Sequence, residues 1–494
     1  MMAHLPALAV VVPLMTAPLT VLVNRPALVW RLATLSCLLT FAVAVGLLAR
    51  VLELGPFVYE IGGWAAPWGI EYRIDAFNAY VVLVVTGVSA VAMPFARRSV
   101  EREVERDRAY LLYCAWMLAL TGLVGIAVTG DLFNVFVFLE ISSLATYVLV
   151  SMGRGRAAPL AALRYLVVGT VGATFFLIGV GLLYEMTGSL NMADLAARIP
   201  PIADSRVVHA GFVFIVLGLA LKAALFPLHA WLPGAYGAAP SAVTAFLAGT
   251  ATKVAIYALL RVVFTVFGAR FAFGTMAFDV LLVPLALAGI LVASAVAVFQ
   301  QDLKRMLAYS SVAQIGYMLL GAGLVSEAGL TGGIVHMFNH ALAKTALFLA
   351  LGCIAYRVGT VTVASMAGLG RRMPWTMAAF VLGGLSLVGV PLTAGFVSKW
   401  YLVQAALERD LWWVAAIVLF ASVLALIYTG RVAEAAYFRP AVPGGLPDRA
   451  REAPLSMLVP VWLLVGLNFY FGIDAALSAG VAGEAARGLL GGVS

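Results

Sequence analysis

The sequence has few charged residues and very few cysteines. Charged side chains make up 11% of its 494 residues, whereas 63% are hydrophobic and the mean hydropathy is +1.03. A soluble protein of this composition would lack the polar surface needed to face water. The three cysteines, Cys37, Cys114 and Cys353, lie in apolar stretches without CxxC spacing, which disfavours metal and cofactor sites and favours packing. The composition indicates a polytopic helical membrane protein.

Apolar runs of about 20 residues recur along the chain, the length of a membrane-spanning helix and too long for a barrel strand. We therefore predict an all-α polytopic membrane protein with about fourteen spans. The first is expected to be a retained helix, since no basic residue precedes it. The predicted spans are residues 5–23, 28–52, 74–96, 109–129, 131–151, 159–185, 207–231, 241–265, 276–299, 302–324, 328–358, 374–406, 410–438 and 452–475.

Basic residues are distributed unevenly between the two sets of loops, so the net charge of +8 is not read as a nucleic-acid signal. Nineteen arginines and lysines follow the odd-numbered spans, Lys304 and Arg449 among them, whereas eight lie on the other side. The positive-inside rule then places both termini outside.

Lysine is scarce, and four of the five lysines fall deep inside predicted spans: Lys222, Lys253, Lys344 and Lys399; the fifth, Lys304, lies at the edge of one and is counted with the inner loops. A charge at mid-bilayer costs about 2.5–3.5 kcal/mol, so such residues are usually functional. A buried lysine can lose its proton near neutral pH, whereas arginine stays protonated. The pattern favours titration at depth.

Other titratable residues fall at similar depth. Glu140 follows Asp131 by nine residues, or about 13 Å of helix, which places it near the middle of the membrane. His336, His340 and Lys344 recur every four residues and line one helix face. Zinc at this histidine pair is disfavoured because no carboxylate accompanies it. A hydrated proton relay fits the spacing better.

Two predicted spans carry a proline beside a lysine: Pro227 with Lys222, and Pro391 with Lys399. Proline removes a helical hydrogen bond, so we expect breaks in helices 7 and 12. Their spacing predicts two inverted five-helix repeats, helices 4–8 and 9–13. The expected parts are 1–108, with an outer β-hairpin near 55–73, the repeats 109–265 and 276–438, and a C-terminal helix and tail at 439–494; a surface helix is expected at 188–200.

Four motifs in this order resemble one family: GDLFNVFVFLEISSLATYVLV, LKAALFPLHAWLPGAYGAAPSAVTAFLAGTATKVAIYALLR, DLKRMLAYSSVAQIGYMLLG and HMFNHALAKTALFLALG. They are similar to the proton-translocating, antiporter-like subunits of respiratory complex I and of Mrp-type cation/proton antiporters. The resemblance covers about residues 75–475. It disfavours the larger complex I member, whose long lateral helix follows the last spans.

The resemblance implies a proton path through Glu140, Lys222, Lys253, His336, His340, Lys344 and Lys399, with proton uptake near His229 at the cytoplasmic end of helix 7. It implies a Na⁺/H⁺ antiporter subunit in the bacterial inner membrane that works with other membrane subunits, carries no metal or cofactor and is not itself an enzyme. A redox-linked proton pump of the complex I or membrane-bound hydrogenase type remains the alternative. A lone solute transporter or a non-conducting scaffold fits the charge row less well. Since Glu140 is the one central carboxylate and a cation site wants several, we expect Na⁺ to pass elsewhere.

Overall fold

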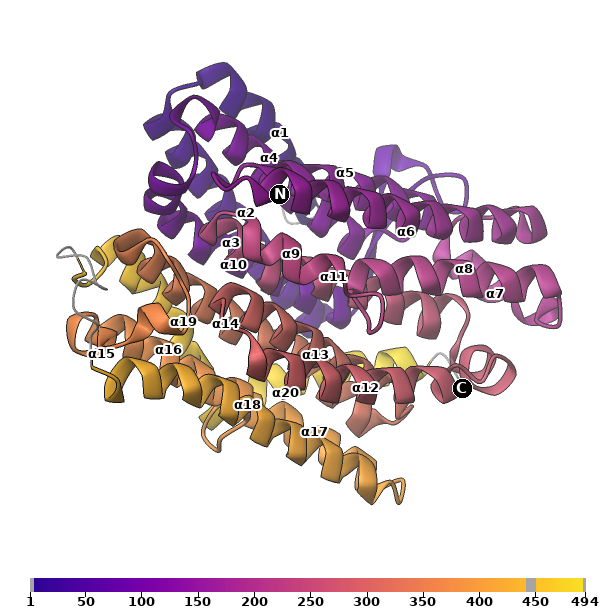
Figure 1. Ribbon diagram of the computed structural model, residues 1–494. Helices are drawn as coiled ribbons and strands as arrows, with labels where there is room; N and C mark the ends of the chain where they lie inside the picture. Colours follow the sequence, from indigo (N-terminus) through magenta and orange to yellow (C-terminus); the bar gives the residue numbers. More distant parts are fainter. Residues whose placement is uncertain (1–3, 441–449, 492–494) are drawn as a thin grey trace.

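The computed structural model describes residues 4–440 and 450–491. Nearly all of this part is helical, and the helices run side by side along one direction (Figure 1). Twelve helical segments of the described chain have the length and apolar composition to cross a membrane. α13 and the interrupted pair α16–α17 occupy the two remaining predicted spans, so the prediction of about fourteen spans is confirmed.

The longer helices are α1 (Leu5–Val23), α2 (Pro26–Leu54), α3 (Ala76–Glu103), α4 (Ala109–Val128), α5 (Leu132–Ser151), α6 (Ala157–Thr187), α8 (Arg206–Ala223), α12 (Phe278–Phe299), α13 (Leu303–Gly323), α14 (Glu327–Val358), α18 (Trp412–Phe438) and α19 (Leu455–Ile473). The shorter ones are α7 (Met192–Arg198), α9 (Trp231–Ala238), α10 (Ser241–Gly249), α11 (Ala251–Arg261), α15 (Leu369–Arg372), α16 (Pro374–Val388), α17 (Ala394–Leu407) and α20 (Ala476–Leu490). Single turns of 3₁₀-helix are η2 (Ile61–Gly63), η3 (Arg106–Arg108), η4 (Pro200–Ile202) and η7 (Ala364–Met366), and two π-helical segments are η5 (Val262–Val266) and η6 (Arg270–Thr275).

Both predicted helix breaks are present. α8 ends at Ala223 and the next residue, Ala224, takes a left-handed conformation with φ 56°, before α9 begins at Trp231. α16 ends at Val388, where Gly389 has φ 85°, and α17 begins at Ala394. These breaks leave the last carbonyls of α8 and α16 without helical partners. The inverted repeat that they suggested remains a prediction.

Two further interruptions have no proline to announce them. Thr250 departs from helical geometry between α10 and α11, so the predicted span 241–265 is not one continuous helix. The C-terminal helix is also divided in two: α19 ends at Ile473, and a second helix, α20, follows where a tail was expected. Arg487 of α20 pairs with Glu327 at 2.8 Å, so α20 runs along α14 to its first turn.

One end of the bundle carries the small sheet. Strands β1 (Phe57–Glu60) and β2 (Glu71–Ile74) pair antiparallel, with Phe57 opposite Ile74, and α7 lies beside them through the bridge Asp131–Asn191 and the bond from the Gly130 amide to the Glu71 carbonyl. We call this end, formed by β1, β2, α7 and η6, the hairpin face. His4 contacts Tyr59 at 3.1 Å, so the start of the described chain lies at this face.

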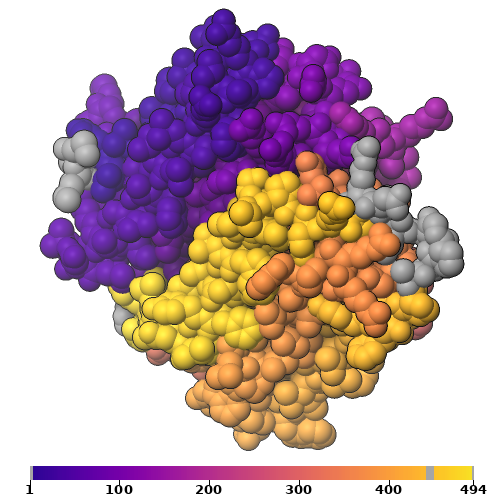
Figure 2. Space-filling view, turned by 90° about the vertical axis from the view of Figure 1, so that its left-hand side faces the viewer, coloured from indigo at the N-terminus to yellow at the C-terminus, as the bar shows by residue number. Residues whose placement is uncertain are grey.

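The opposite face carries α15 and the carboxyl end of α3 (Figure 1). Figure 2 looks onto it and shows the N-terminal segments on one side and the last helices on the other. The charge count predicts that this opposite face is the inner one; Arg449, one of the residues in that count, lies outside the described residues. α14 is buried along most of its length, which places its titratable face at the centre of the molecule.

Candidate functional site: a row of buried titratable residues

Glu140 and Lys222 form the one ion pair in the described chain between two residues of the predicted row. Lys222 lies in the last turn of α8, and its Nζ is 3.8 Å from a carboxylate oxygen of Glu140 on α5. The Nζ also donates to Ser143 Oγ at 2.7 Å and to Tyr147 Oη at 3.4 Å. Glu140 is 26% exposed at its side chain, whereas Lys222 is 7% exposed. In this pair, Glu140 therefore lies at the side surface of the molecule and Lys222 lies in its interior.

Lys253 lies in the first turn of α11, beside the interruption at Thr250. Its Nζ donates to the carbonyl of Ala248, near the end of α10. Carbonyls at a helix end lack helical partners and carry the negative end of the helix dipole. The break that the sequence did not reveal therefore supplies the acceptor for a buried ammonium group.

α14 buries its two histidines and Lys344 in the interior of the molecule. His336 hydrogen bonds through Nδ1 to Ser398 Oγ and through Nε2 to Gln314 Oε1, both at 2.8 Å. His340 stacks near it, with ring centroids 6.2 Å apart, and neither of its ring nitrogens has a partner within the described chain. Lys344 donates to the Leu307 carbonyl at 2.7 Å and to Ser310 Oγ.

Lys399 uses the second predicted break. It lies on α17 and donates to the carbonyls of Leu387 and Val388, each at 2.9 Å, which end α16. It also donates to Ser422 Oγ at 2.8 Å and lies over the Tyr317 ring. At the first break, the Leu221 carbonyl is instead satisfied by the indole N–H of Trp231 at 3.1 Å. The two breaks thus have similar backbone conformations, but the free carbonyls are bound by the Trp231 indole at the first break and by the Lys399 ammonium at the second.

The row is close enough to interact as one electrostatic system on the side of α14. Lys253 lies within electrostatic range of His336, His340 and Lys344, and Lys399 within range of His336. On the other side, a cavity of about 30 Å³ lies between Lys222 and α11, lined by Ser142, Ser143 and Ala251. A cavity of that size holds about one or two water molecules.

His229 lies at the first helix break. It lies between α8 and α9, stacked on Phe226 at 5.3 Å between ring centroids. The eight residues of α9 still follow it before the opposite face, a rise of about 12 Å. His229 thus lies at the break between the two half-helices, and its part in proton uptake stays a prediction.

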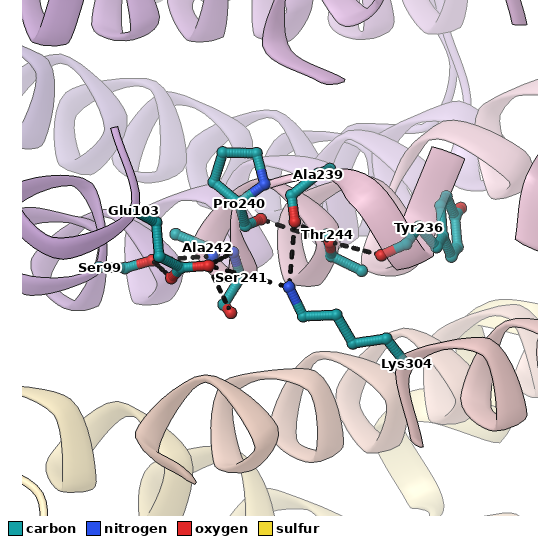
Figure 3. Close-up of polar contacts among 9 residues, drawn as sticks. All are labelled: Ser99, Glu103, Tyr236, Ala239, Pro240, Ser241, Ala242, Thr244 and Lys304. Carbon is teal, nitrogen blue, oxygen red and sulfur yellow. Dashed lines mark hydrogen bonds and ion pairs between the residues drawn. The ribbon is translucent and has the colours of Figure 1, made fainter. Parts of the chain in front are cut away.

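Sequence reasoning missed one buried charged cluster, shown in Figure 3. Lys304, predicted in an inner loop, is 7% exposed in the first turn of α13, donates to the Ala239 carbonyl at 3.0 Å and lies 3.8 Å from Glu103. Glu103 accepts from the amide and hydroxyl of Ser241, both at 2.9 Å, and from Ser99 Oγ at 2.6 Å. Because Asp302 and Arg305 lie close to Lys304 in the sequence, this segment was interpreted as a solvent-exposed turn.

Fold and site together define a class: a polytopic helical membrane protein with interrupted helices and a row of titratable groups through its interior. The model of the family described as NADH:quinone oxidoreductase/Mrp antiporter, transmembrane, matches residues 129–425. The chain belongs to this family.

Relatives come from both branches of that family. The chain is 44% identical to NADH-quinone oxidoreductase subunit N of Desulforudis audaxviator, over 94% of each chain. It is 33% identical to the D subunit of the Na(+)/H(+) antiporter of Alkalihalophilus pseudofirmus, over 88% of this chain and 86% of that one.

Solved structures share the fold over the whole chain. A chain of the Mrp complex from Dietzia matches with TM-score 0.89 and 28% identity, covering 99% of this chain and 97% of that one. A chain of an archaeal membrane-bound sulfane sulfur reductase matches with TM-score 0.90 and 32% identity, covering 99% and 98%. Both neighbours are parts of multisubunit membrane complexes.

Proposed function

We propose that this chain is the proton-translocating membrane subunit of a multisubunit Na⁺/H⁺ antiporter, corresponding to the D subunit of the Mrp type. The observation that carries the proposal is the row of buried lysines and histidines, in which one carboxylate pairs with one lysine. A set of charges that merely neutralised one another would pair lysines with carboxylates. Lys253, Lys344 and Lys399 instead donate to carbonyls and hydroxyls, groups that stabilise an ammonium without locking it in that state.

The Glu140–Lys222 pair is the proposed start of the path. At about 4 Å and an effective dielectric of about 20, their attraction amounts to ~4 kcal/mol. Glu140 is partly exposed on the flank of α5, among the exposed side chains of Val137 and Leu144, where a neighbouring membrane subunit can reach it. A charge change in that neighbour weakens the pair, and Lys222 then releases its proton.

The released proton crosses from Lys222 towards Lys253 through the small cavity beside Ser143. It continues along α14 by way of His340, whose nitrogens lack partners in the described chain, and His336, with Lys344 at the same face. Ser398 joins His336 to α17, the helix that carries Lys399. His229, which lies away from the opposite face, takes a supporting part in proton uptake.

The chain works with other membrane subunits in this proposal, in a bacterial inner membrane and with both termini outside. It is a transport subunit rather than an enzyme and needs no metal or cofactor. Since a Na⁺ site wants several clustered oxygen ligands, the sodium path belongs to another subunit.

A second candidate is the antiporter-like proton-pumping subunit of a complex I-type oxidoreductase or a membrane-bound hydrogenase. The relative at 44% identity, named as a subunit of NADH-quinone oxidoreductase, favours it. The same row would carry protons in both cases, and the driving partner would differ.

The test is Na⁺-dependent dissipation of a pH gradient in vesicles that contain the whole complex. Wild type is compared with Lys222→Met and Glu140→Gln, which keep size and remove charge. We expect both variants to assemble and to lose at least about 90% of transport, since a charged group that transfers protons contributes about 10²-fold or more.

The outcomes separate the two candidates. A Na⁺ response that both substitutions abolish supports the antiporter. Vesicles without a Na⁺ response, in which redox-driven proton pumping is lost on substitution, support the second candidate. Unchanged transport in both variants would mean that the pair is structural and the proposal wrong.

A further inference from the structure

His336 is held on both sides by side chains from neighbouring helices. Its Nε2 lies 2.8 Å from Oε1 of Gln314 on α13, and its Nδ1 lies 2.8 Å from Oγ of Ser398 on α17. All three residues are buried, with at most 2% of their surface exposed. His340, one turn further along α14, has no such partners in the described chain. One of the two histidines of α14 is therefore fixed in place by its neighbours, and the other is not.

Gln314 determines which nitrogen of His336 can exchange a proton. An amide oxygen accepts hydrogen bonds and cannot donate them, so the contact with Oε1 requires a hydrogen on His336 Nε2. A neutral imidazole carries one N–H, and an imidazolium carries two. Because Nε2 is protonated in both forms, Nδ1 is the nitrogen that gains and loses a proton.

Ser398 can bond both forms of the ring. Its Oγ has two partners, His336 Nδ1 at 2.8 Å and the carbonyl of Gly395 in its own helix at 3.1 Å. A hydroxyl has one hydrogen, so it donates to one of them at a time. When His336 is neutral, the hydroxyl donates to Nδ1. When His336 is charged, Nδ1–H donates to Oγ, and the hydroxyl hydrogen turns to the Gly395 carbonyl, so neither state requires a heavy atom to move.

The titratable groups that face His336 come from α11, α13, α14 and α17. Lys253 and Lys399 lie within electrostatic range, the ring centroid of Tyr317 is 5.4 Å away, and that of His340 is 6.2 Å away. None of the four is a carboxylate, so the charged form of His336 depends on its two hydrogen bonds for stabilisation. Hydrogen bonds to a charged group are also stronger than those between neutral groups.

We propose that Gln314 and Ser398 are positioning residues for proton transport, which hold His336 in one orientation while its Nδ1 gains and loses a proton. The inference rests on the proposed function, in which His336 carries a proton along the row. On uptake, one N–H bond forms at Nδ1 and the Ser398 hydroxyl turns to the Gly395 carbonyl. On release, that N–H bond breaks and the hydroxyl turns back. The imidazole ring does not rotate, so uptake and release occur at the same nitrogen, on the side of α17.

The first test compares two substitutions of Gln314 that have opposite effects on the charged histidine. Gln314→Glu keeps the shape and places a carboxylate beside Nε2, which favours the charged form by about 1–3 pH units. Gln314→Met keeps the length and removes the acceptor. We expect the pH profile of pH-gradient dissipation, measured in vesicles with the whole complex, to move to higher pH by about one unit or more for Gln314→Glu and to lower pH for Gln314→Met. A side chain needed only for packing would not produce opposite shifts.

The second test is Ser398→Ala, measured in the same vesicles. It leaves Nδ1 without a partner in both protonation states, and we expect transport to slow at least about tenfold, the effect of a lost hydrogen bond to a charged group. Thr121→Val is the matched control, because Thr121 is a buried residue of α4 whose hydroxyl bonds the Met117 carbonyl of its own helix at 2.8 Å. The control is expected to transport at the wild-type rate, and both variants to assemble in wild-type amounts.

The inference is overturned if both Gln314 variants keep the wild-type pH profile or move it in the same direction, or if Ser398→Ala transports as fast as Thr121→Val, while Lys222→Met remains inactive. In that case the proposed function stands, and Gln314 and Ser398 serve packing alone. If Gln314→Glu does not assemble, Gln314→Met and Ser398→Ala decide, and wild-type transport in either one overturns the inference. If Lys222→Met also transports normally, the proposed function itself fails.

Discussion

At the scale of residues, the buried lysines differ in what holds their charge. Lys222 has a carboxylate and two hydroxyls, whereas Lys253 and Lys399 have the carbonyls of interrupted helices. A buried ammonium without such acceptors would cost several kcal/mol. The row is thus a series of sites in which each lysine has its own source of stabilisation.

Ser143 offers a residue-scale test of this view. Its hydroxyl accepts from Lys222 at 2.7 Å, and removing it takes about 1.5–3 kcal/mol of stabilisation from the charged lysine. We expect Ser143→Ala to slow pH-gradient dissipation at least about tenfold.

Ser151 of the same helix is the control, because its hydroxyl bonds the Val148 carbonyl of its own helix at 2.7 Å and it does not line the small cavity. Ser151→Ala is expected to retain wild-type transport. Equal losses in the two variants would point to general disturbance of α5 and against a specific role for Ser143.

The sequence predicted Lys222, Lys253 and Lys399 as buried because each stands in an apolar run. The same reasoning failed for Lys304, which has Asp302 and Arg305 close by. Hydropathy counts charges and takes no account of Glu103, which is about two hundred residues away in sequence and reaches Lys304 only after folding. Partners of buried charges are a tertiary property.

At the scale of elements, the interruptions decide where the lysines are held. Prolines predicted the breaks in helices 7 and 12, since proline removes a helical donor. Thr250 and the α19–α20 junction have no such marker. Near the junction, the carbonyl of Leu392, which is distant in sequence, lies against Gly472 of α19. These two breaks were therefore invisible in the sequence.

Gly389 gives an element-scale prediction. Its φ of 85° is unfavourable for any residue with a Cβ, by about 1–2 kcal/mol, and an added Cβ would lie 2.8 Å from Lys399 Cδ. We expect Gly389→Ala to lower the thermal unfolding temperature of the purified complex and to reduce proton transport by displacing Lys399.

Gly430 of α18 is the matched control, because an added Cβ there meets nothing within 4 Å in the described chain. Gly430→Ala should leave transport intact and stabilise the helix by up to ~1 kcal/mol. A Gly389→Ala variant as stable and active as wild type would show that the break tolerates other conformations.

At the scale of the whole molecule, Glu103 ties together three parts of the chain. It ends α3, caps the start of α10 through Ser241, and pairs with Lys304 of α13 (Figure 3). The predicted domain limits near residues 108 and 276 separate these parts in sequence. The cluster brings them together at the opposite face.

We therefore expect Glu103→Ala to destabilise the complex by about 3 kcal/mol, since it leaves Lys304 buried without its carboxylate. Glu101→Ala, two residues away, should change stability by less than about 1 kcal/mol, because Glu101 pairs with Arg97 and Arg98 at an exposed site. Thermal unfolding of the two variants in detergent decides between them. Similar losses would mean that the end of α3 matters as a whole and the Glu103 cluster does not.

The carbonyl acceptors at the helix interruptions have a mechanical consequence. A carboxylate partner changes its influence on a lysine by gaining or losing a proton, but a carbonyl cannot titrate. The stabilisation that these carbonyls give to the charged Lys253 and Lys399 changes only when α10 or α16 moves relative to the lysine. The position of the helix and the protonation of the lysine are therefore coupled. A movement of α10 or α16 changes the free energy of protonating the lysine, and protonation of the lysine in turn favours one position of the helix.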